Sequence, residues 1–310
     1  MTTALAQPVA ITLTPEQSRV FDDLLSIGTQ RPTMPADLAD QLAERISSGT
    51  ADIATRWKDS KVWLTKSTIG TTLRCEGQLV ANAASPTSQT MHAPTAVGIV
   101  AHKAIQIAHT HPARGISQYV DAALEASLSD GSFAAYWHEL SIATQSDLIS
   151  QMVSKTTSFL DSFPPLDSSW VPRFEEPIQA RLGKLVLSAR PDFTLGRPRA
   201  DLRQSMFLAD MKTGSLNDEH FDEAMFYALV ATLRYKVAPF RSVVYSLASG
   251  EWTDPDVTPE RLMHAADRVV LSANTYVDVL TERREAELRA GRHCTWCPAR
   301  TTCPAVPETN

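Results

Sequence analysis

Residues 205–214 read Ser205-Met-Phe-Leu-Ala-Asp210-Met-Lys212-Thr-Gly214, and this stretch decides the fold class. An apolar run ends in an acidic residue that is followed, two positions later, by a lysine. Because alternate side chains of a β-strand point to the same face, Asp210 and Lys212 are predicted to share one face and Met211 to lie on the other. The stretch therefore predicts a buried strand that ends in a carboxylate beside an ammonium group.

Further strands are predicted before and after this one. Leu185-Val186-Leu187 leads into residues 190–195, and residues 241–247 form another run of strand-forming residues. A crossover helix is predicted between them, over residues 218–236. If the preceding strand, expected to end at Asp192, and the strand that ends at Asp210 form a hairpin, the two carboxylates can converge on one divalent cation.

Helices are predicted on both sides of this strand-rich block. Residues 14–60 are expected to be helical with a break at Pro32–Pro35, residues 85–94 to be a loop, and residues 95–109 to form an apolar helix. Two or three amphipathic helices are expected in residues 113–160, and a last helix from Thr258-Pro259 to Gly291. This order predicts an α/β fold with a mixed sheet and a helical insertion.

The composition narrows the class of protein. The 310 residues carry a formal net charge of −6 with 43% hydrophobic residues, which suits a packed domain and leaves any nucleic-acid site to a local patch. The sequence contains no signal-peptide pattern and no apolar run long enough to span a membrane. We therefore expect a cytoplasmic protein.

Four cysteines form the second notable feature. Cys294, Cys297 and Cys303 fall within ten residues, and Cys75 is the only other cysteine in the sequence. Disulfides are not expected in a reducing compartment, whereas four thiolates suit zinc or an iron–sulfur cluster. Zinc with His293 in place of Cys75, and buried cysteines without a metal, remain alternatives.

Three residues of the helices add to the carboxylates and the lysine. His102 lies in the middle of an apolar helix, and Glu223 and Tyr227 are four residues apart on one face of the crossover helix. Taken alone, His102 is typical of a buried core histidine, and Glu223 with Tyr227 is typical of an ordinary amphipathic helix. A carboxylate beside a lysine suits metal-dependent phosphodiester cleavage, because the carboxylate holds a hard cation and the lysine positions or activates the attacking water.

In this order the residues resemble the RecB-like PD-(D/E)XK nucleases that carry an iron–sulfur cluster, a group that includes AddB-type helicase–nuclease subunits and CRISPR-associated exonucleases. That family shows a first cysteine, a histidine, an aspartate, Asp/Glu-x-Lys, a Gln-x3-Tyr helix and three clustered cysteines. The matching residues, between about residues 64 and 304, are Cys75, His102, Asp192, Asp210-x-Lys212, Glu223-x3-Tyr227 and Cys294, Cys297 and Cys303. Glu223 departs from the usual Gln, and Arg190-Pro191 replaces a more usual glycine-led turn.

The resemblance implies a restriction-endonuclease-like core and a residue-by-residue assignment of roles. The expected ligands of Mg²⁺ or Mn²⁺ are His102, Asp192, Asp210 and the Met211 carbonyl. Lys212 is the expected catalytic lysine, acting with Asp192 and Asp210. Glu223, Tyr227 and Arg190 are the expected substrate contacts. A [4Fe–4S] cluster bound by Cys75, Cys294, Cys297 and Cys303 would join the two ends of the nuclease domain.

The domain plan that follows has residues 1–60 as a helical N-terminal appendage and residues 61–310 as the nuclease domain. The helical insertion falls at about 113–160 and the cysteine motif at 294–303. Six basic residues flank Asp192 and could line a DNA path or form a solvated face; they are Arg181, Lys184, Arg190, Arg197, Arg199 and Arg203.

The sequence thus predicts a DNA nuclease, an exonuclease acting on ends or single strands in repair, recombination or defence. A helicase or another complex subunit is an expected partner, because the sequence contains no Gly-x4-Gly-Lys-[Ser/Thr] motif of its own. Two alternatives remain, namely a catalytically inactive nuclease-fold DNA-binding or scaffold subunit and a zinc-stabilised interaction protein.

Overall fold

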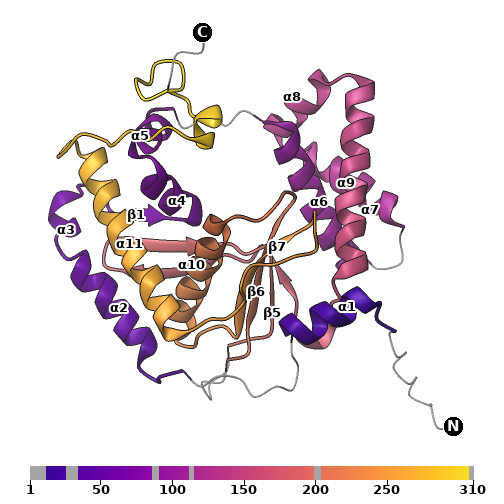
Figure 1. Ribbon diagram of the computed structural model, residues 1–310, viewed down its shortest axis with the longest axis horizontal. Helices are drawn as coiled ribbons and strands as arrows, with labels where there is room; N and C mark the ends of the chain where they lie inside the picture. The colour runs from indigo at the N-terminus through magenta and orange to yellow at the C-terminus, as the bar shows by residue number, and fades with distance from the viewer. Residues whose placement is uncertain (1–11, 26–33, 86–90, 112–114, 199–203, 307–310) are drawn as a thin grey trace.

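A computed structural model describes residues 12–25, 34–85, 91–111, 115–198 and 204–306 of the chain (Figure 1). The helices are α1 (Pro15–Val20), the π-helical turn η1 (Phe21–Leu25), α2 (Leu38–Gly49), α3 (Ile53–Arg56), α4 (Lys66–Arg74), α5 (Glu76–Ala84), α6 (Ala93–Thr110), α7 (Ile116–Ser127), α8 (Gly131–Glu139), α9 (Ile142–Ser162), α10 (Asp218–Tyr235), α11 (Pro259–Leu280) and the 3₁₀ turns η2 (Ser168–Trp170) and η3 (Arg292–Trp296). The strands are β1 (Val62–Leu64), β2 (Arg173–Phe174), β3 (Ile178–Leu182), β4 (Leu185–Ala189), β5 (Phe193–Leu195), β6 (Phe207–Lys212) and β7 (Arg241–Ser246).

The strands form two mixed sheets at the centre of the molecule. One has the order β1-β4-β3, with β1 parallel and β3 antiparallel to β4. The other has the order β2-β5-β6-β7, in which only β6 and β7 pair in parallel. Helix α10 is the crossover between β6 and β7, as predicted. The α/β class with mixed sheets flanked by helices is therefore confirmed.

The predicted hairpin is present. Strands β5 and β6 are antiparallel with Phe193 opposite Ala209, so Asp192 and Asp210 come next to each other at the end of the ladder. Gly196, which follows β5, has φ +78°, and an added Cβ would lie 2.1 Å from the Ser205 carbonyl oxygen. Only glycine permits this close approach of the two chain segments.

The two faces of β6 meet different cores. Met211 is 2% exposed and packs in an aromatic cluster that includes Phe159, Phe193 and Tyr245, beneath α1, α6 and α9. The opposite face is covered by α10, whose middle residues are almost all buried. The predicted alternation of Met211 against Asp210 and Lys212 is thus confirmed.

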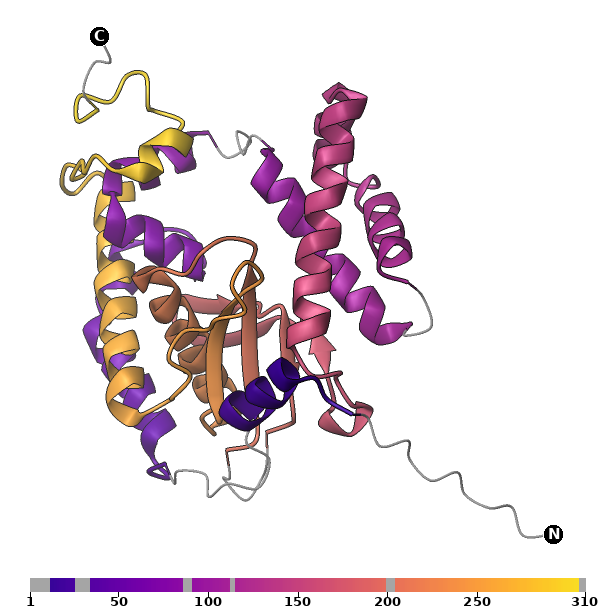
Figure 2. The same cartoon turned by 45° about the vertical axis from the view of Figure 1, so that its right-hand side comes forward.

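Helices α6 to α9 stand together beside the sheets (Figure 2). Helices α7, α8 and α9 confirm the two or three helices predicted for residues 113–160. They pack on α6 around Val100, Phe133, Trp137 and Met152. Helix α6 therefore has one side in this helical core and contributes Ala101 and Ile105 to the core under β6. It begins at Ala93, slightly earlier than predicted, and residues 86–90 of the predicted loop lie outside the described ranges.

The N-terminal helices contribute to the main core. Leu42 and Ile46 of α2 are fully buried with Leu229 of α10 and Val269 of α11. The boundary at residue 60 and the separate status of residues 1–60 stay predictions. None of the helices in the described ranges has the length and apolar character needed to cross a bilayer.

The prediction that the last helix continues to Gly291 is wrong, because α11 ends at Leu280. Glu282 adopts φ +56°, a left-handed conformation that does not continue a helix. The chain then runs along α5, where the Arg284 guanidinium donates to both Glu76 oxygens at 2.6 and 2.7 Å. Arg289 also donates to the Leu73 carbonyl at 3.2 Å. These long-range contacts, which no local pattern encodes, hold the C-terminal segment against α4 and α5.

Candidate active site and cysteine cavity

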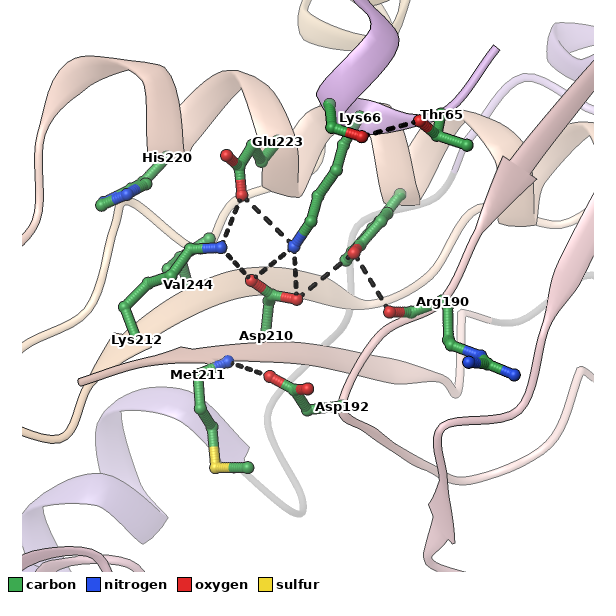
Figure 3. Close-up of polar contacts among 12 residues, drawn as sticks. Thr65, Lys66, Arg190, Asp192, Asp210, Met211, Lys212, His220, Glu223 and Val244 are labelled. Atoms are coloured by element: carbon green, nitrogen blue, oxygen red, sulfur yellow. Dashed lines mark hydrogen bonds and ion pairs between the residues drawn. The ribbon is translucent and has the colours of Figure 1, made fainter. Parts of the chain in front are cut away.

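Asp210 lies at the centre of a network of charged side chains and is only 3% exposed (Figure 3). Lys212 Nζ lies 2.7 Å from Asp210 Oδ2 and 2.9 Å from Glu223 Oε2. Lys66 Nζ lies 2.8 Å from each oxygen of Asp210 and 3.4 Å from Glu223 Oε2. We call Lys66, Asp210, Lys212 and Glu223 the carboxylate–lysine cluster.

Each member of this cluster is placed by a different feature of the chain. The pleat of β6 puts Asp210 and Lys212 on one face, and α10 lies over that face and carries Glu223. Lys66 comes from the first turn of α4, which starts there because Thr65 caps the helix by accepting from the Thr68 N–H. Sequence reasoning missed Lys66, since 144 residues separate it from Asp210 and no spacing rule connects them.

Neighbouring charges outweigh the effect of burial on the pKa of Asp210 and of Lys66. Burial alone would raise the pKa of Asp210, but Lys66 and Lys212 outweigh it and hold that pKa below its usual value. Burial would likewise lower the pKa of Lys66, yet Asp210 and Glu223 hold it above its usual value. The metal-free protein therefore has an anionic Asp210 and a cationic Lys66 at neutral pH.

The phenol of Tyr227 is a further contact of Asp210. Its phenol lies 3.2 Å from Asp210 Oδ1 and 3.1 Å from the Arg190 carbonyl oxygen, and its single proton can go to either acceptor. Burial, and then the Asp210 charge, raise the pKa of Tyr227, which therefore stays a donor. With 2% of the residue exposed, Tyr227 contacts the candidate active site rather than the molecular surface, so its direct DNA contact stays a prediction.

Asp192 occupies the other side of the hairpin end. Its Oδ2 accepts from the Met211 N–H, and its Oδ1 lies 3.1 Å from His102 Nδ1. Burial would lower the pKa of His102, but Asp192 raises it more, and the pKa lies above its usual value. The structure thus brings together His102 and Asp192, and separately Asp210 and Lys212, around the end of one hairpin.

A cavity of about 690 Å³ adjoins the carboxylate–lysine cluster. Lys66 and Glu223 line it, and further residues of α4, α10 and α11 form its walls, among them Arg74, Phe221 and Arg261. This space gives solvent and ligands access to the two cluster residues that come from helices.

The predicted basic residues are not gathered at this cavity. Arg190 is 65% exposed in its side chain, and Arg197 is also exposed. Lys184 donates to the Trp57 carbonyl, and Arg181 lines a different cavity with Arg234 and Lys236. Arg199 and Arg203 lie outside the described ranges.

The four cysteines line one cavity of about 180 Å³, which we call the cysteine cavity. Cys75 is buried at the junction of α4 and α5, and Cys294, Cys297 and Cys303 are half-buried in and after η3. All four are free thiols. All four thus line one cavity, but among the described residues no three cysteines come close enough together to hold a metal, so the predicted cluster is not confirmed.

Backbone and side-chain groups shape the cysteine cavity. The Gly291 N–H donates to Cys294 Sγ at 3.3 Å, and His293 Nε2 lies 3.9 Å from the same sulfur. A Cβ on Gly77 would lie 2.2 Å from Leu288 Cδ2, so glycine lets the C-terminal segment pack against α5 next to the cavity.

A comparison with models of known protein families gives a match. The model of the PD-(D/E)XK nuclease superfamily matches residues 65–304.

The chain belongs to the PD-(D/E)XK nuclease superfamily.

The matched region begins at Thr65, next to Lys66, and ends just after Cys303, so it contains both the carboxylate–lysine cluster and the cysteine cavity. No match is found among curated proteins.

Members of the PD-(D/E)XK superfamily generally hydrolyse phosphodiester bonds and usually use Mg²⁺ or Mn²⁺, so we asked whether the residues fit such a cation. Within the described ranges, no three His, Cys, Asp or Glu side chains lie close enough together to hold a metal ion. The donor types nevertheless fit, because Asp192, paired with His102, and Asp210 lie at the end of the same hairpin. In addition, His102 Nε2 is buried without a hydrogen-bond partner among the described residues, as expected of a nitrogen reserved for a ligand.

Proposed function

We propose that the protein is a Mg²⁺- or Mn²⁺-dependent deoxyribonuclease, and one observation carries this proposal. The β5–β6 hairpin sets Asp192 beside Asp210, with Lys212 2.7 Å from the Asp210 carboxylate and His102 3.1 Å from the Asp192 carboxylate. This arrangement lies inside the region that matches the nuclease superfamily.

In the proposed mechanism, His102, Asp192, Asp210 and the Met211 carbonyl hold the cation. When bound, the cation polarises the scissile phosphate and lowers the pKa of a water molecule. Lys212 donates hydrogen bonds to the attacking water and to the developing charge on the phosphate. Glu223 keeps the Lys212 ammonium in place from α10, while Arg190 at the exposed end of the site contacts the DNA backbone.

The proposal is tested by cleavage of single- and double-stranded DNA labelled at the 5′ or the 3′ end, with Mg²⁺, Mn²⁺ or EDTA. We expect cation-dependent cleavage that falls at least about a hundredfold in Lys212→Gln, because that substitution removes the ammonium that assists the nucleophile. Lys61→Gln, an exposed lysine at the start of β1, is the matched control and should retain full activity. Full activity in Lys212→Gln would refute the site, and the labels report polarity and exonucleolytic or endonucleolytic action.

For the cysteine cavity we propose a [4Fe–4S] cluster bound by Cys75, Cys294, Cys297 and Cys303. Two observations support this proposal, namely the resemblance to cluster-bearing nucleases and the fact that all four thiols line one cavity of about 180 Å³. The N–H to sulfur contact at Cys294 is of the kind that tunes such clusters.

Metal analysis and absorption spectra of anaerobically purified protein separate the candidates. A brown protein with about four iron atoms per chain and absorption near 400 nm, in order of magnitude, is expected. A colourless protein with one zinc ion per chain would assign the cavity to zinc, with His293 tested as a ligand.

The finer biological assignment rests on the resemblance to the RecB-like branch. We propose an exonuclease that acts on DNA ends or single strands in repair, recombination or defence, in the cytoplasm, with a helicase or another subunit as partner. A catalytically inactive DNA-binding or scaffold subunit is the alternative, favoured by the pairing of Asp210 with two lysines. DNA binding without cleavage under all cation conditions would support that alternative.

A further inference from the structure

Lys66 is a member of the carboxylate–lysine cluster that neither strand spacing nor the family resemblance assigns. It enters the site from α4 and contacts both oxygens of Asp210 at 2.8 Å. Its Nζ also lies 5.1 Å from the centre of the Tyr227 ring. The side chain is therefore directed into the candidate active site rather than toward solvent, as Figure 3 shows.

The contacts of Asp210 leave no place for a cation unless one donor moves. A carboxylate offers about four lone-pair positions. Lys66 takes one on each oxygen and Lys212 takes one on Oδ2. The Tyr227 phenol, 3.2 Å from Oδ1, blocks the fourth whether its proton points to Asp210 or to the Arg190 carbonyl. A divalent cation bound to Asp210 must therefore replace one of these three donors.

Lys66 is the donor best placed to leave. Lys212 is fixed on β6 two residues from Asp210 and is also paired with Glu223 at 2.9 Å. Tyr227 is 2% exposed and packed inside α10. The ammonium of Lys66, by contrast, lies at the end of a flexible four-carbon side chain. Lys66 also lines the cavity of about 690 Å³, which has room for this ammonium.

We propose that Lys66 occupies the cation's place on Asp210 in the metal-free protein and swings into the adjoining cavity when a divalent cation binds. This inference rests on the proposed metal-dependent function. Lys66 then competes with the cation, and it also keeps the buried Asp210 paired while the cation is absent. Lys66 is thus a positioning residue that sets the cation affinity of the site.

The charge count adds a consequence for the substrate. In the metal-free cluster, Lys66 and Lys212 balance Asp210 and Glu223. A bound divalent cation adds two positive charges, and an anionic phosphodiester removes part of that excess. The released Lys66 ammonium, in the cavity beside the site, is then a donor for a phosphate oxygen, so cation binding and phosphodiester binding should reinforce each other.

The test is Mn²⁺ binding to the full chain without DNA, measured by titration calorimetry and by the Mn²⁺-induced rise in Tm. Lys66→Met should bind Mn²⁺ at least about tenfold more tightly than the wild type, because the cation no longer displaces charge-assisted hydrogen bonds. Its Tm should also rise more on addition of Mn²⁺. Lys66→Arg, which keeps the competing charge, should bind with equal or weaker affinity, and Lys61→Met should match the wild type.

Asp210→Asn separates failure of this inference from failure of the proposed function. If Asp210→Asn does not weaken Mn²⁺ binding, the proposed cation site itself is wrong. If Asp210→Asn weakens binding and Lys66→Met leaves it unchanged or weaker, the cation site stands and Lys66 is only a structural partner of Asp210. Should Lys66→Met fail to fold, Lys66→Gln, which lacks the charge but retains a polar group, is measured against the same expectations.

Discussion

Helix α4 connects two regions that the chain builds in different ways. At its first residue, Lys66 joins the carboxylate–lysine cluster, whose other members lie on β6 and α10. Directly after its last residue, Cys75 joins the cysteine cavity, whose other cysteines lie on a short 3₁₀ turn and the irregular chain beyond it. Asp210 is 3% exposed, whereas Cys294, Cys297 and Cys303 are half-buried.

The difference concerns what fixes each geometry. Backbone ladders and a packed helix hold the first site, so its side chains are in position before any ligand binds. Few regular backbone hydrogen bonds hold the second site, so we expect its geometry to depend on the ligand that its thiols bind. Loss of a ligand residue should therefore abolish chemistry at the first site and folding at the second.

The largest effect is expected at the cysteine cavity. Cys297→Ser should destabilise the protein by about 5 kcal/mol, because the proposed cross-link between Cys75 and the C-terminal cysteines closes a loop of well over one hundred residues. The measurement is the yield of soluble protein and its Tm, with Thr301→Ser as the matched control. A stable, folded but inactive Cys297→Ser protein would show that the cavity serves chemistry instead of folding.

The next effect is expected at the hairpin end. Asp192→Asn should lower the rate of cation-dependent DNA cleavage about a thousandfold, which corresponds to the loss of one charged cation ligand. Its Tm should change little, since an asparagine oxygen can still accept from the Met211 N–H. A large fall in Tm would mean that this site, like the cysteine cavity, is held by its ligands.

A smaller effect should follow from loosening the C-terminal segment. Glu76→Gln replaces a carboxylate that accepts two hydrogen bonds from Arg284 and one from the Glu287 N–H, at a cost of about 1–3 kcal/mol. Limited proteolysis should then cut residues 281–306 faster, with retention of metal in the cysteine cavity reduced. Glu287→Gln, which loses an exposed pair with Arg289, is the control.

The Arg284–Glu76 ion pair makes the stability of the folded protein depend on pH. The Arg284 guanidinium holds the pKa of Glu76 below its usual value, so the unfolded chain takes up a proton at higher pH than the folded protein. The stabilisation is complete above the usual glutamate pKa and is lost as the pH falls through the lower pKa of the folded state. Acid unfolding of Glu76→Gln should lack this contribution; identical acid curves for both proteins would contradict the assignment.

The smallest effect is expected at the side-chain contact between Trp296 and His92. Trp296, in the cysteine motif, packs against His92 with tilted rings whose centroids lie 4.5 Å apart, and His92 is the N-cap residue of the helix that carries His102. Because Trp296 is 59% exposed, Trp296→Ala should cost only about 0.5–1 kcal/mol of stability. DNA cleavage should be nearly unchanged, and a strong loss would indicate that the cysteine motif positions α6.

Local patterns predicted the parts of the molecule that depend on local rules. The alternation along β6 fixed the faces of Asp210, Met211 and Lys212, and the apolar runs gave the strands and the crossover helix. The order of the motifs along the chain, compared with that of the family, predicted that His102 and Asp192 lie together. The cysteine cluster that the resemblance implies stays a prediction, because the structure shows only that Cys75 and the C-terminal cysteines line the same cavity.

The features that sequence patterns did not predict are contacts between residues far apart in the chain. Lys66 contacts Asp210 across 144 residues, and its stretch of sequence reads only as a helix start. Glu223 was expected to contact substrate, but in the structure it pairs with Lys212 and Lys66. Helix α11 ends at Leu280 before Glu282, which has a left-handed backbone, and the Arg284–Glu76 pair, which has no local signature, holds the segment beyond it.

The most direct test of the proposed site is a crystal structure with Mn²⁺, read from the anomalous scattering of the ion. The account predicts a peak within about 2.0–2.6 Å of carboxylate oxygens of both Asp192 and Asp210, next to His102 Nε2, with Lys66 moved away from Asp210. A saturated crystal in which Mn²⁺ binds elsewhere, while Lys66 and Lys212 both remain on Asp210, would contradict it.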